Sequence, residues 1–333
     1  MVRLVEKLHG PMEWKGFEKW GLTVMLFLWA AMAWIVGLAS LPGSREAWSA
    51  APRVTPISQL HHIHGLAVSP RDPRILYIAT HEGLIRLTEG KQWELVGEDH
   101  SDFMGFTLAP TTAEAMYASG HPSGTSHRKN PVGVIVSRDG GQSWQPLALE
   151  GMVDLHAMTM SADGMTLYGW NVMPPPGLYR ISTKDGTWTK LEAPQLQDVF
   201  SLAAHPQQRE TLLAGTRSGL LVSRDEGRSW TPLSPSLTGV PVTVTVYHPR
   251  DPKLLYAYAA RQDLGFLKST DGGQTWTPLG FFLGERDAVA VVAVSPQDGE
   301  VLYLSTFSSD LHQSGDGGKS LKLLAKQGKP AAR

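Results

Sequence analysis

The chain has 333 residues, of which 42% are apolar and 18% are charged, so it is long enough to bury a large hydrophobic core. Its formal net charge of −1 and the lack of a basic stripe argue against a nucleic-acid-binding protein. Because the chain contains no cysteine, disulfide bonds and thiolate metal sites are excluded.

An uncharged apolar run covers residues 21–41 and follows a polar N-terminal segment, residues 1–20. At about 1.5 Å per residue, a helix of this length crosses a hydrocarbon layer of roughly 30 Å. The basic residues near the run are Arg3, Lys7, Lys15 and Lys19 before it, and Arg45 and Arg53 after it. The excess before the run predicts a cytoplasmic tail, a membrane helix and an extracytoplasmic (periplasmic or extracellular) remainder. A cleaved signal peptide and a buried globular helix are the alternatives.

After a tether at residues 42–56, the chain repeats one pattern six times. Each unit begins with an apolar strand that ends near a proline, which Ala162 replaces in the third unit, continues through a strand rich in Leu, Tyr and Ala, and closes at a polar turn. The six starting strands are 64–70, 104–110, 156–162, 200–206, 243–249 and 290–296. Four short strands at a period of 40 to 52 residues are typical of β-propeller blades.

The closing turns share the frame Ser-x-Asp-x-Gly-x-Ser/Thr-Trp. Full copies lie at residues 137–144, 223–230 and 269–276, and weaker copies at 314–321, 184–188 and 89–93. The aspartate side chain can cap backbone amides of a tight turn, and the glycine can take a positive φ. We therefore expect Asp139, Asp225, Asp271 and Asp316 to fix the turns, with Trp144, Trp230 and Trp276 packed beneath them.

These patterns predict an all-β fold, a six-bladed β-propeller over residues 57–325, preceded by one N-terminal transmembrane helix and followed by a tail at 326–333. Residues 54–60 are left over before the first unit, and we expect them to add a strand to the last blade. Such an addition would close the ring and remove exposed sheet edges.

The repeated frame resembles the Asp-box, or BNR repeat, of sialidases, the sortilin ectodomain and the photosystem II assembly propellers. The stretch His61-His-Ile-His-Gly-Leu66 with Ser119-Gly-His-Pro122 is similar to small bacterial propellers labelled as glycosyl hydrolases. The resemblance covers about residues 57–325 and implies the propeller fold. It leaves the function open, because proteins with this repeat include enzymes, receptors and assembly factors.

Alignment of the six blade starts on their prolines places two residues of each innermost strand at one end of the central channel. The polar members are His62 and His64, Asp102 with Met104, Asp154 with His156, and Asp198. Imidazole and thioether ligands together suit copper, especially copper(I). We therefore predict a metal site of His62, His64, Met104 and His156, with His121 from a blade-two loop, whose histidines are oriented by Asp102 and Asp154.

Three other interpretations of the channel end compete with a metal site. It could be a hydrated polar channel or an organic-ligand site. It could instead be the site of a sialidase-like or other exo-glycoside hydrolase that uses Asp102, Asp154 and Asp198. Arg217, Arg261 and Arg286 could then approach the channel. The third interpretation, which we favour as the overall function, is a non-catalytic binding or assembly module with a protein partner at the membrane. Exposed candidates for that contact are the loops 172–177 and 280–283.

Overall fold

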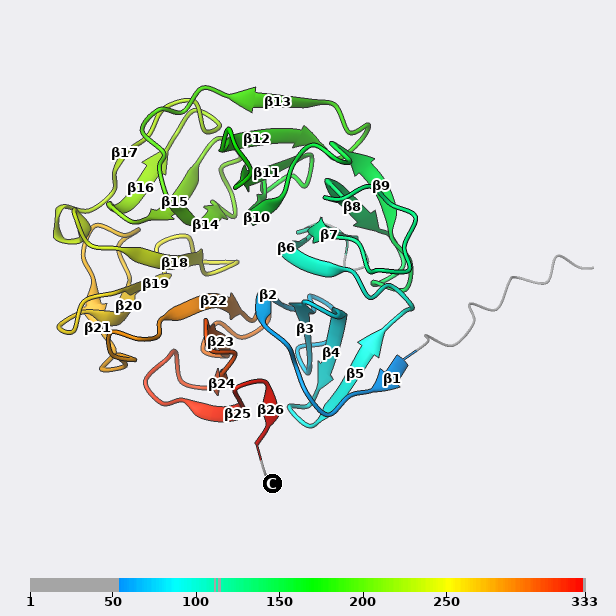
Figure 1. Cartoon of the computed structure of the whole chain (residues 1–333). Coiled ribbons are helices and arrows are strands. Elements are labelled where there is room, and N and C mark those ends of the chain that lie inside the picture. Colours follow the sequence, from blue (N-terminus) through cyan, green and yellow to red (C-terminus); the bar gives the residue numbers. More distant parts are fainter. Residues whose placement is uncertain (1–53, 111, 113–114, 332–333) are drawn as a thin grey trace, which may run out of the picture. The chain divides into compact units, whose positions relative to one another are not determined.

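The computed structural model describes residues 54–110, 112 and 115–331, which form six antiparallel sheets arranged around a channel as the blades of a β-propeller (Figure 1). Within these residues the only helical element is the 3₁₀ helix η1 (Pro235–Leu237). None of the helices in the described ranges has the length and apolar character needed to cross a membrane. The predicted cytoplasmic tail, the membrane helix at 21–41 and tether residues 42–53 lie outside the described residues.

The first three blades contain thirteen strands. Blade one has β1 (Val54–Pro56), β2 (Ile63–Val68), β3 (Ile75–Thr80), β4 (Gly83–Thr88) and β5 (Gln92–Val96); blade two has β6 (Asp102–Leu108), β7 (Met116–His121), β8 (Val134–Ser137) and β9 (Gln145–Ala148); blade three has β10 (Leu155–Met160), β11 (Thr166–Asn171), β12 (Gly177–Ser182) and β13 (Trp188–Leu191).

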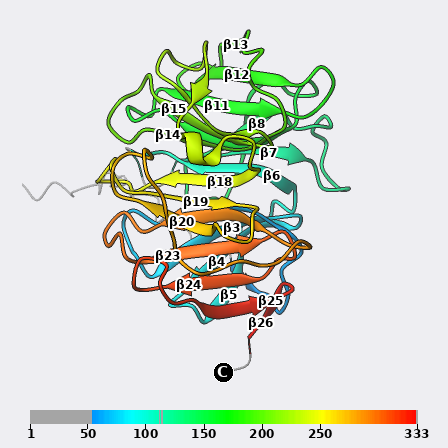
Figure 2. The same ribbon diagram turned by 90° about the vertical axis from the view of Figure 1, so that its left-hand side faces the viewer.

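The last three blades follow the same order. Blade four has β14 (Val199–Ala204), β15 (Leu212–Thr216), β16 (Gly219–Ser223) and β17 (Thr231–Pro232); blade five has β18 (Val242–Tyr247), β19 (Leu255–Ala259), β20 (Gly265–Ser269) and β21 (Thr277–Pro278); blade six has β22 (Val289–Val294), β23 (Leu302–Thr306), β24 (Leu311–Ser314), β25 (Lys322–Lys326) and β26 (Lys329–Pro330). Figure 2 turns the ring to blade five, whose strands β18, β19 and β20 lie one above another.

The innermost strands of the blades form the centre of the ring, and each packs against the innermost strands of its two neighbours (Figure 1). Their side chains line the cavities that make up the central channel. These strands are β2, β6, β10, β14, β18 and β22. Apolar side chains fill the space between adjacent sheets, so that each buried cluster contains residues from two neighbouring blades. The core is therefore divided among the six blade interfaces, and its geometry fixes the innermost strands around the channel.

The prediction that residues 54–60 join the last blade is wrong. Strand β1 pairs antiparallel with β5 and so extends the outer edge of blade one. Blade six instead receives its fifth strand from its own C-terminal residues, because the chain turns at Gly328 and β26 pairs with β25. This self-pairing occupies the outer edge that the N-terminal strand was expected to cover. The propeller strands thus run from Val54 to Pro330, beyond the expected bounds of 57 and 325.

The four better-preserved Asp-box turns share one hydrogen-bond pattern. In the first, the Ser137 hydroxyl donates to Asp139 Oδ1 over 2.8 Å and accepts the Gly141 amide over 2.8 Å. Asp139 also accepts the Ser143 amide over 3.0 Å and the Ser143 hydroxyl over 2.6 Å. The same contacts are made by Asp225, Asp271 and Asp316. These carboxylates are used within the turn itself.

The tryptophans of the full motifs pack against the preceding blade. Trp144 lies in the cluster between blades one and two, and Trp230 in the cluster between blades three and four, where they are 3% and 4% exposed. Trp276 packs on the cluster between blades four and five. Trp93 occupies the equivalent place between blades one and six. Blade three is the exception, because its Trp188 is 45% exposed.

Candidate metal and ligand site at one end of the channel

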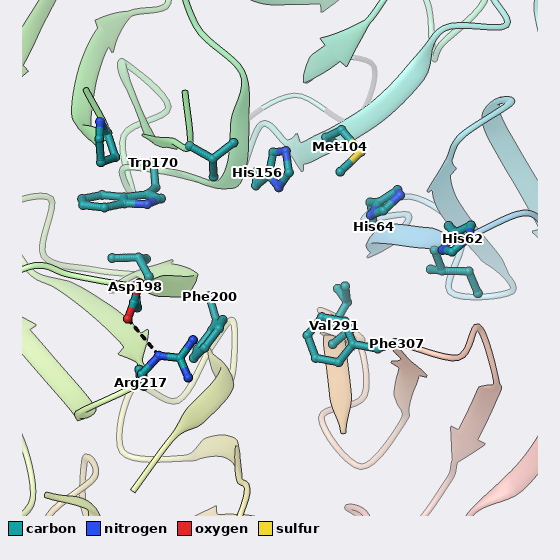
Figure 3. Close-up of a pocket in the computed structure, with 15 residues that line it drawn as sticks. His62, His64, Met104, His156, Trp170, Asp198, Phe200, Arg217, Val291 and Phe307 are labelled. Carbon is teal, nitrogen blue, oxygen red and sulfur yellow. Dashed lines mark hydrogen bonds and ion pairs between the residues drawn. The ribbon is translucent and has the colours of Figure 1, made fainter. Parts of the chain in front are cut away.

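Each innermost strand has a β-bulge near its start, where one residue lacks a partner on the adjacent strand. In blade order the bulge residues are His64, Met104, His156, Phe200, Thr243 and Ala290. A bulge re-aims a side chain, and bulges are frequent beside functional sites. Five of these six residues line one cavity of about 480 Å³, and all six belong to the set that alignment on the blade prolines selected (Figure 3).

A second ring of residues lies at the C-terminal end of the second strand of each blade. In blade order it consists of His81, His121, Val172, Arg217, Ala260 and Phe307. The backbone amides of Val172 and Arg217 donate to the carbonyls of Asp154 and Asp198, each over 3.1 Å, which brings this ring beside the starts of the innermost strands. His81 and Phe307 are missing from the sequence-based prediction. Their common position after the second strand was the signal that would have identified them.

Three histidines of blade one stack on one another. The ring centroid of His81 lies 4.6 Å from those of both His62 and His64, with interplanar angles of 27° and 20°. Burial, with further contributions from His81, His156 and His62, lowers the pKa of His64 to about 3. His64 is therefore neutral at pH 7, which is the protonation state that a metal ligand requires.

His64, His81 and Asp102 form a compact group of donor atoms, with one atom from each residue lying within 4.8 Å of the other two. Two buried atoms of these residues, His64 Nε2 and Asp102 Oδ1, have no hydrogen-bond partner among the described residues. Leaving a buried polar atom unpaired costs about 1–3 kcal/mol, so a ligand that pairs with these atoms would stabilise the site. Two imidazoles and one carboxylate are ligands that divalent transition metals accept. The geometry thus places Asp102 among the candidate donors, whereas the sequence predicted that it only orients them.

Asp154 is a buried carboxylate that holds two histidines. Its Oδ2 lies 2.9 Å from Nε2 of His156 and 3.4 Å from Nε2 of His121. Burial alone would raise the pKa of Asp154, but the hydrogen bonds and charges of His156 and His121 outweigh burial and lower it. Because Nε2 of His156 is engaged, its Nδ1 is the nitrogen available to a ligand. This is the arrangement expected of a carboxylate that orients a histidine.

Met104 lies between His156 and His64 in Figure 3, with its sulfur on the side of His64. His62, His64, Met104 and His156, four of the five predicted metal ligands, line the same cavity. The fifth, His121, joins this group through Asp154 and is held by Asn130, whose Oδ1 lies 2.8 Å from His121 Nδ1.

The opposite wall of the cavity has a different character. Asp198 accepts a hydrogen bond from Arg217 Nε over 2.8 Å, and the guanidinium of Arg217 lies 5.9 Å from the centroid of the Phe200 ring. Trp170 completes this wall, where Figure 3 shows it near Asp198. Asp198 is thus paired with Arg217, whereas the hydrolase hypothesis grouped it with Asp102 and Asp154.

Of the remaining candidates from the sequence, Arg261, Arg286 and the loop 280–283 do not line this cavity, whereas Val172 and Pro176 of the loop 172–177 do. Arg261 and Arg286 line another cavity beside Phe282, and Arg261 Nε donates to Asp263 over 2.6 Å. In the loop 280–283, Phe282 stacks on Tyr258 with the ring centroids 6.5 Å apart, so this loop packs inward. The loop 172–176 is exposed.

The BNR/Asp-box repeat family matches residues 135–146 and 267–278, which contain the turns that end in Trp144 and Trp276. No curated protein is significantly similar in sequence to this chain. The sequence match is therefore confined to the turn motifs, and the solved structures extend the comparison to the propeller.

A GH74 xyloglucanase from Xanthomonas campestris is similar over 82% of this chain and 47% of its own length, with 20% identity and a TM-score of 0.56. An ancestral GH74 enzyme is similar over 83% of this chain and 40% of its own length, with 14% identity and a TM-score of 0.52. YCF48 from Cyanidioschyzon merolae is similar over 80% of this chain and 97% of its own length, with 12% identity and a TM-score of 0.51. This chain spans less than half the length of the GH74 enzymes, and at these identities the likeness shows the fold alone. The chain is a six-bladed β-propeller that carries BNR/Asp-box repeats.

Proposed function

We propose that this chain is a non-catalytic binding propeller, anchored by residues 21–41 on the extracytoplasmic side of a membrane, whose channel end binds a transition-metal ion. The observation that carries the proposal is the buried His64 Nε2, which finds no hydrogen-bond partner in the described part of the chain and belongs to a residue grouped with His81 and Asp102. A neutral imidazole in this position can donate its lone pair to a cation without first losing a proton.

Copper is the first candidate metal because of the mixture of ligands. The thioether of Met104 and the imidazoles of His64 and His156 suit copper(I), whereas the carboxylate of Asp102 suits a divalent ion. A site with both kinds of ligand can hold copper in either oxidation state. Zinc would be satisfied by the nitrogen and oxygen donors alone.

A protein partner at the membrane is the second part of the proposal. The loop 172–176 lies next to the cavity and exposes Val172 and Met173, which are 39% and 36% accessible. Apolar side chains on an exposed loop provide contact area for another protein. A propeller held close to the membrane by a single helix suits the assembly of a membrane complex.

Metal titration tests the proposal directly. Full-length protein is treated with EDTA, freed of chelator and titrated with copper(I), copper(II) and zinc(II), for the wild type and a His64→Ala, His81→Ala double variant. We expect the double variant to bind copper at least 100-fold more weakly. His127→Ala, which removes an exposed histidine from a blade-two loop, is the matched control and should bind as the wild type does. Equal binding by the double variant and the wild type would contradict the proposal.

Glycoside hydrolysis is the second candidate function, favoured by the neighbouring carboxylates of Asp102 and Asp154, which are close enough to interact electrostatically. Glycosidases use two carboxylates about 5–9.5 Å apart. Incubation with aryl glycosides and sialosides distinguishes the two functions. Turnover by the wild type that is lost in an Asp102→Asn variant would favour the hydrolase over the binding protein.

A further inference from the structure

We infer that the cavity wall opposite the histidines binds a small organic carboxylate with an aromatic or other apolar body. This inference concerns Arg217, Phe200 and Trp170, and it does not depend on a metal ion at the histidine side. The cavity volume of about 480 Å³ falls within the range of small-molecule sites, about 300–1,000 Å³.

The charged part of the site is the free end of the Arg217 guanidinium. Arg217 is anchored twice to Asp198, through Nε to the carboxylate over 2.8 Å and through its backbone amide to the carbonyl over 3.1 Å. Within the described part of the chain, no residue accepts a hydrogen bond from its two terminal nitrogens. An arginine fixed along one edge presents these two N–H groups as a pair, which matches the two oxygens of a carboxylate.

The backbone holds this pair of side chains in place. Asp198 has a φ of 46°, a left-handed conformation that aspartate adopts more readily than most residues. The residue directs its carboxylate to Arg217 from the start of β14, while Arg217 follows the end of β15. Residues held in sparsely populated conformations gather at binding sites, where the surrounding structure maintains them.

The apolar part of the site consists of aromatic side chains around the guanidinium. Phe200 lies beneath it, Trp170 forms the adjoining wall and Phe307 stands across the cavity (Figure 3). Phe307 is 56% exposed, which is high for a large aromatic side chain in a cavity. A ligand with an apolar body would cover this ring and gain the free energy of removing aromatic surface from water.

The charge of the wall favours a monoanion. Among the described residues that line the cavity, Arg217 is the only lysine or arginine, and Asp198 compensates part of its charge. A phosphate dianion would need further cations. A neutral sugar would need several hydrogen-bonding side chains, whereas this wall offers mainly aromatic rings. A planar carboxylate with an apolar body satisfies both the arginine and the aromatic surface.

Phenylacetate is a suitable probe, with phenylacetamide and acetate as matched comparators. Each is titrated calorimetrically into full-length protein in the presence of EDTA, so that no metal ion contributes. We expect phenylacetate to bind at least tenfold more tightly than phenylacetamide, which lacks the charge, and than acetate, which lacks the ring.

Arg217→Gln should weaken phenylacetate binding at least tenfold and remove its advantage over phenylacetamide. Arg261→Gln, which alters another exposed arginine that pairs with an aspartate outside this cavity, should leave the affinity unchanged. Phe200→Leu should weaken phenylacetate and phenylacetamide alike.

The inference is overturned if phenylacetate fails to bind at millimolar concentration, binds no better than phenylacetamide, or binds Arg217→Gln as tightly as the wild type. Unfolding temperatures of the variants confirm that they are folded, which the 67% exposure of the Arg217 side chain leads us to expect. Because EDTA is present throughout, these outcomes are separate from those of the metal titration.

Discussion

Leu60 donates its backbone N–H to the carbonyl of Gly328 over 2.7 Å, and this contact joins the segment before blade one to the final turn of blade six. Its side chain is 3% exposed and lies in the cluster shared by these two blades. The Leu60 side chain and this backbone hydrogen bond therefore add to the packing of β2 against β22 and β23 that closes the ring, and no strand is exchanged between the first and last blades.

Gly328→Ala should open this closure. Gly328 has a φ of 74°, and a Cβ atom there would lie 1.9 Å from the Leu60 carbonyl oxygen. Gly280 has nearly the same φ, 75°, but an added Cβ would meet no atom within 4 Å. Both substitutions strain the backbone, and we expect Gly328→Ala to cost about 1–3 kcal/mol more because of the added steric conflict. Urea unfolding of the two variants measures the difference, and equal stabilities would show that closure does not depend on this contact.

Trp230→Ala should destabilise the protein by about 3–5 kcal/mol, the usual cost of removing a buried tryptophan ring. Trp230 is 4% exposed between blades three and four, and its Nε1 donates to the Gly227 carbonyl over 2.9 Å. Trp188→Ala is the matched control because Trp188 has the same motif position but is 45% exposed. We expect the control to cost less than about 1 kcal/mol. A Trp230→Ala protein that melts at the wild-type temperature would refute the assigned packing role.

The blades were predictable because the Asp-box is a local structure. Ser137, Asp139 and Ser143 satisfy one another within seven residues, so the motif forms its turn whatever surrounds it. Closure of the ring was not predictable in this way. Strand β26 occupies the outer edge of blade six, and β1 pairs with the outer edge of blade one. Which of these edges β1 joins depends on both ends of the chain, so a local motif does not determine it.

The candidate site was likewise predictable where it depends on local sequence and not where it depends on contacts between strands. Equivalent positions, six residues before Pro70, Pro110 and Ala162, identified His64, Met104 and His156 from spacing alone. The bulges that direct them to the channel left no separate signal, because a bulge is an irregularity of pairing between two strands. His81, which stacks on His62 and His64, was missed because the prediction used only the starts of the innermost strands, whereas His81 follows the second strand of its blade. Arg217 was predicted as a residue that could approach the channel, but its pairing with Asp198 could not be inferred from their separation in the sequence.

Acid should destabilise the metal-free protein through His64. The pKa of His64 is about 3 in the folded protein, against an ordinary value of 6.5. Between these two values the unfolded chain binds a proton that the folded protein excludes, so stability falls as the pH is lowered below 6.5. His64→Gln removes this titration and should reduce the stability lost between pH 7 and pH 5 by about 1–2 kcal/mol. Urea unfolding in EDTA at both pH values tests this, and equal losses in wild type and variant would contradict it.

Met104→Leu should separate copper(I) binding from binding of the divalent ions. Leucine conserves most of the volume of methionine, so the fold should lose less than about 1.5 kcal/mol. The thioether is lost, and only a soft ion such as copper(I) depends on it. We expect copper(I) affinity to fall at least tenfold, while zinc(II) affinity, supported by His64, His81 and Asp102, remains within threefold of the wild type. Competition titrations against a chromogenic chelator of known affinity measure both constants. Unchanged copper(I) binding by Met104→Leu would remove Met104 from the site, and a parallel loss for zinc(II) would mean that the substitution had disturbed the histidines instead.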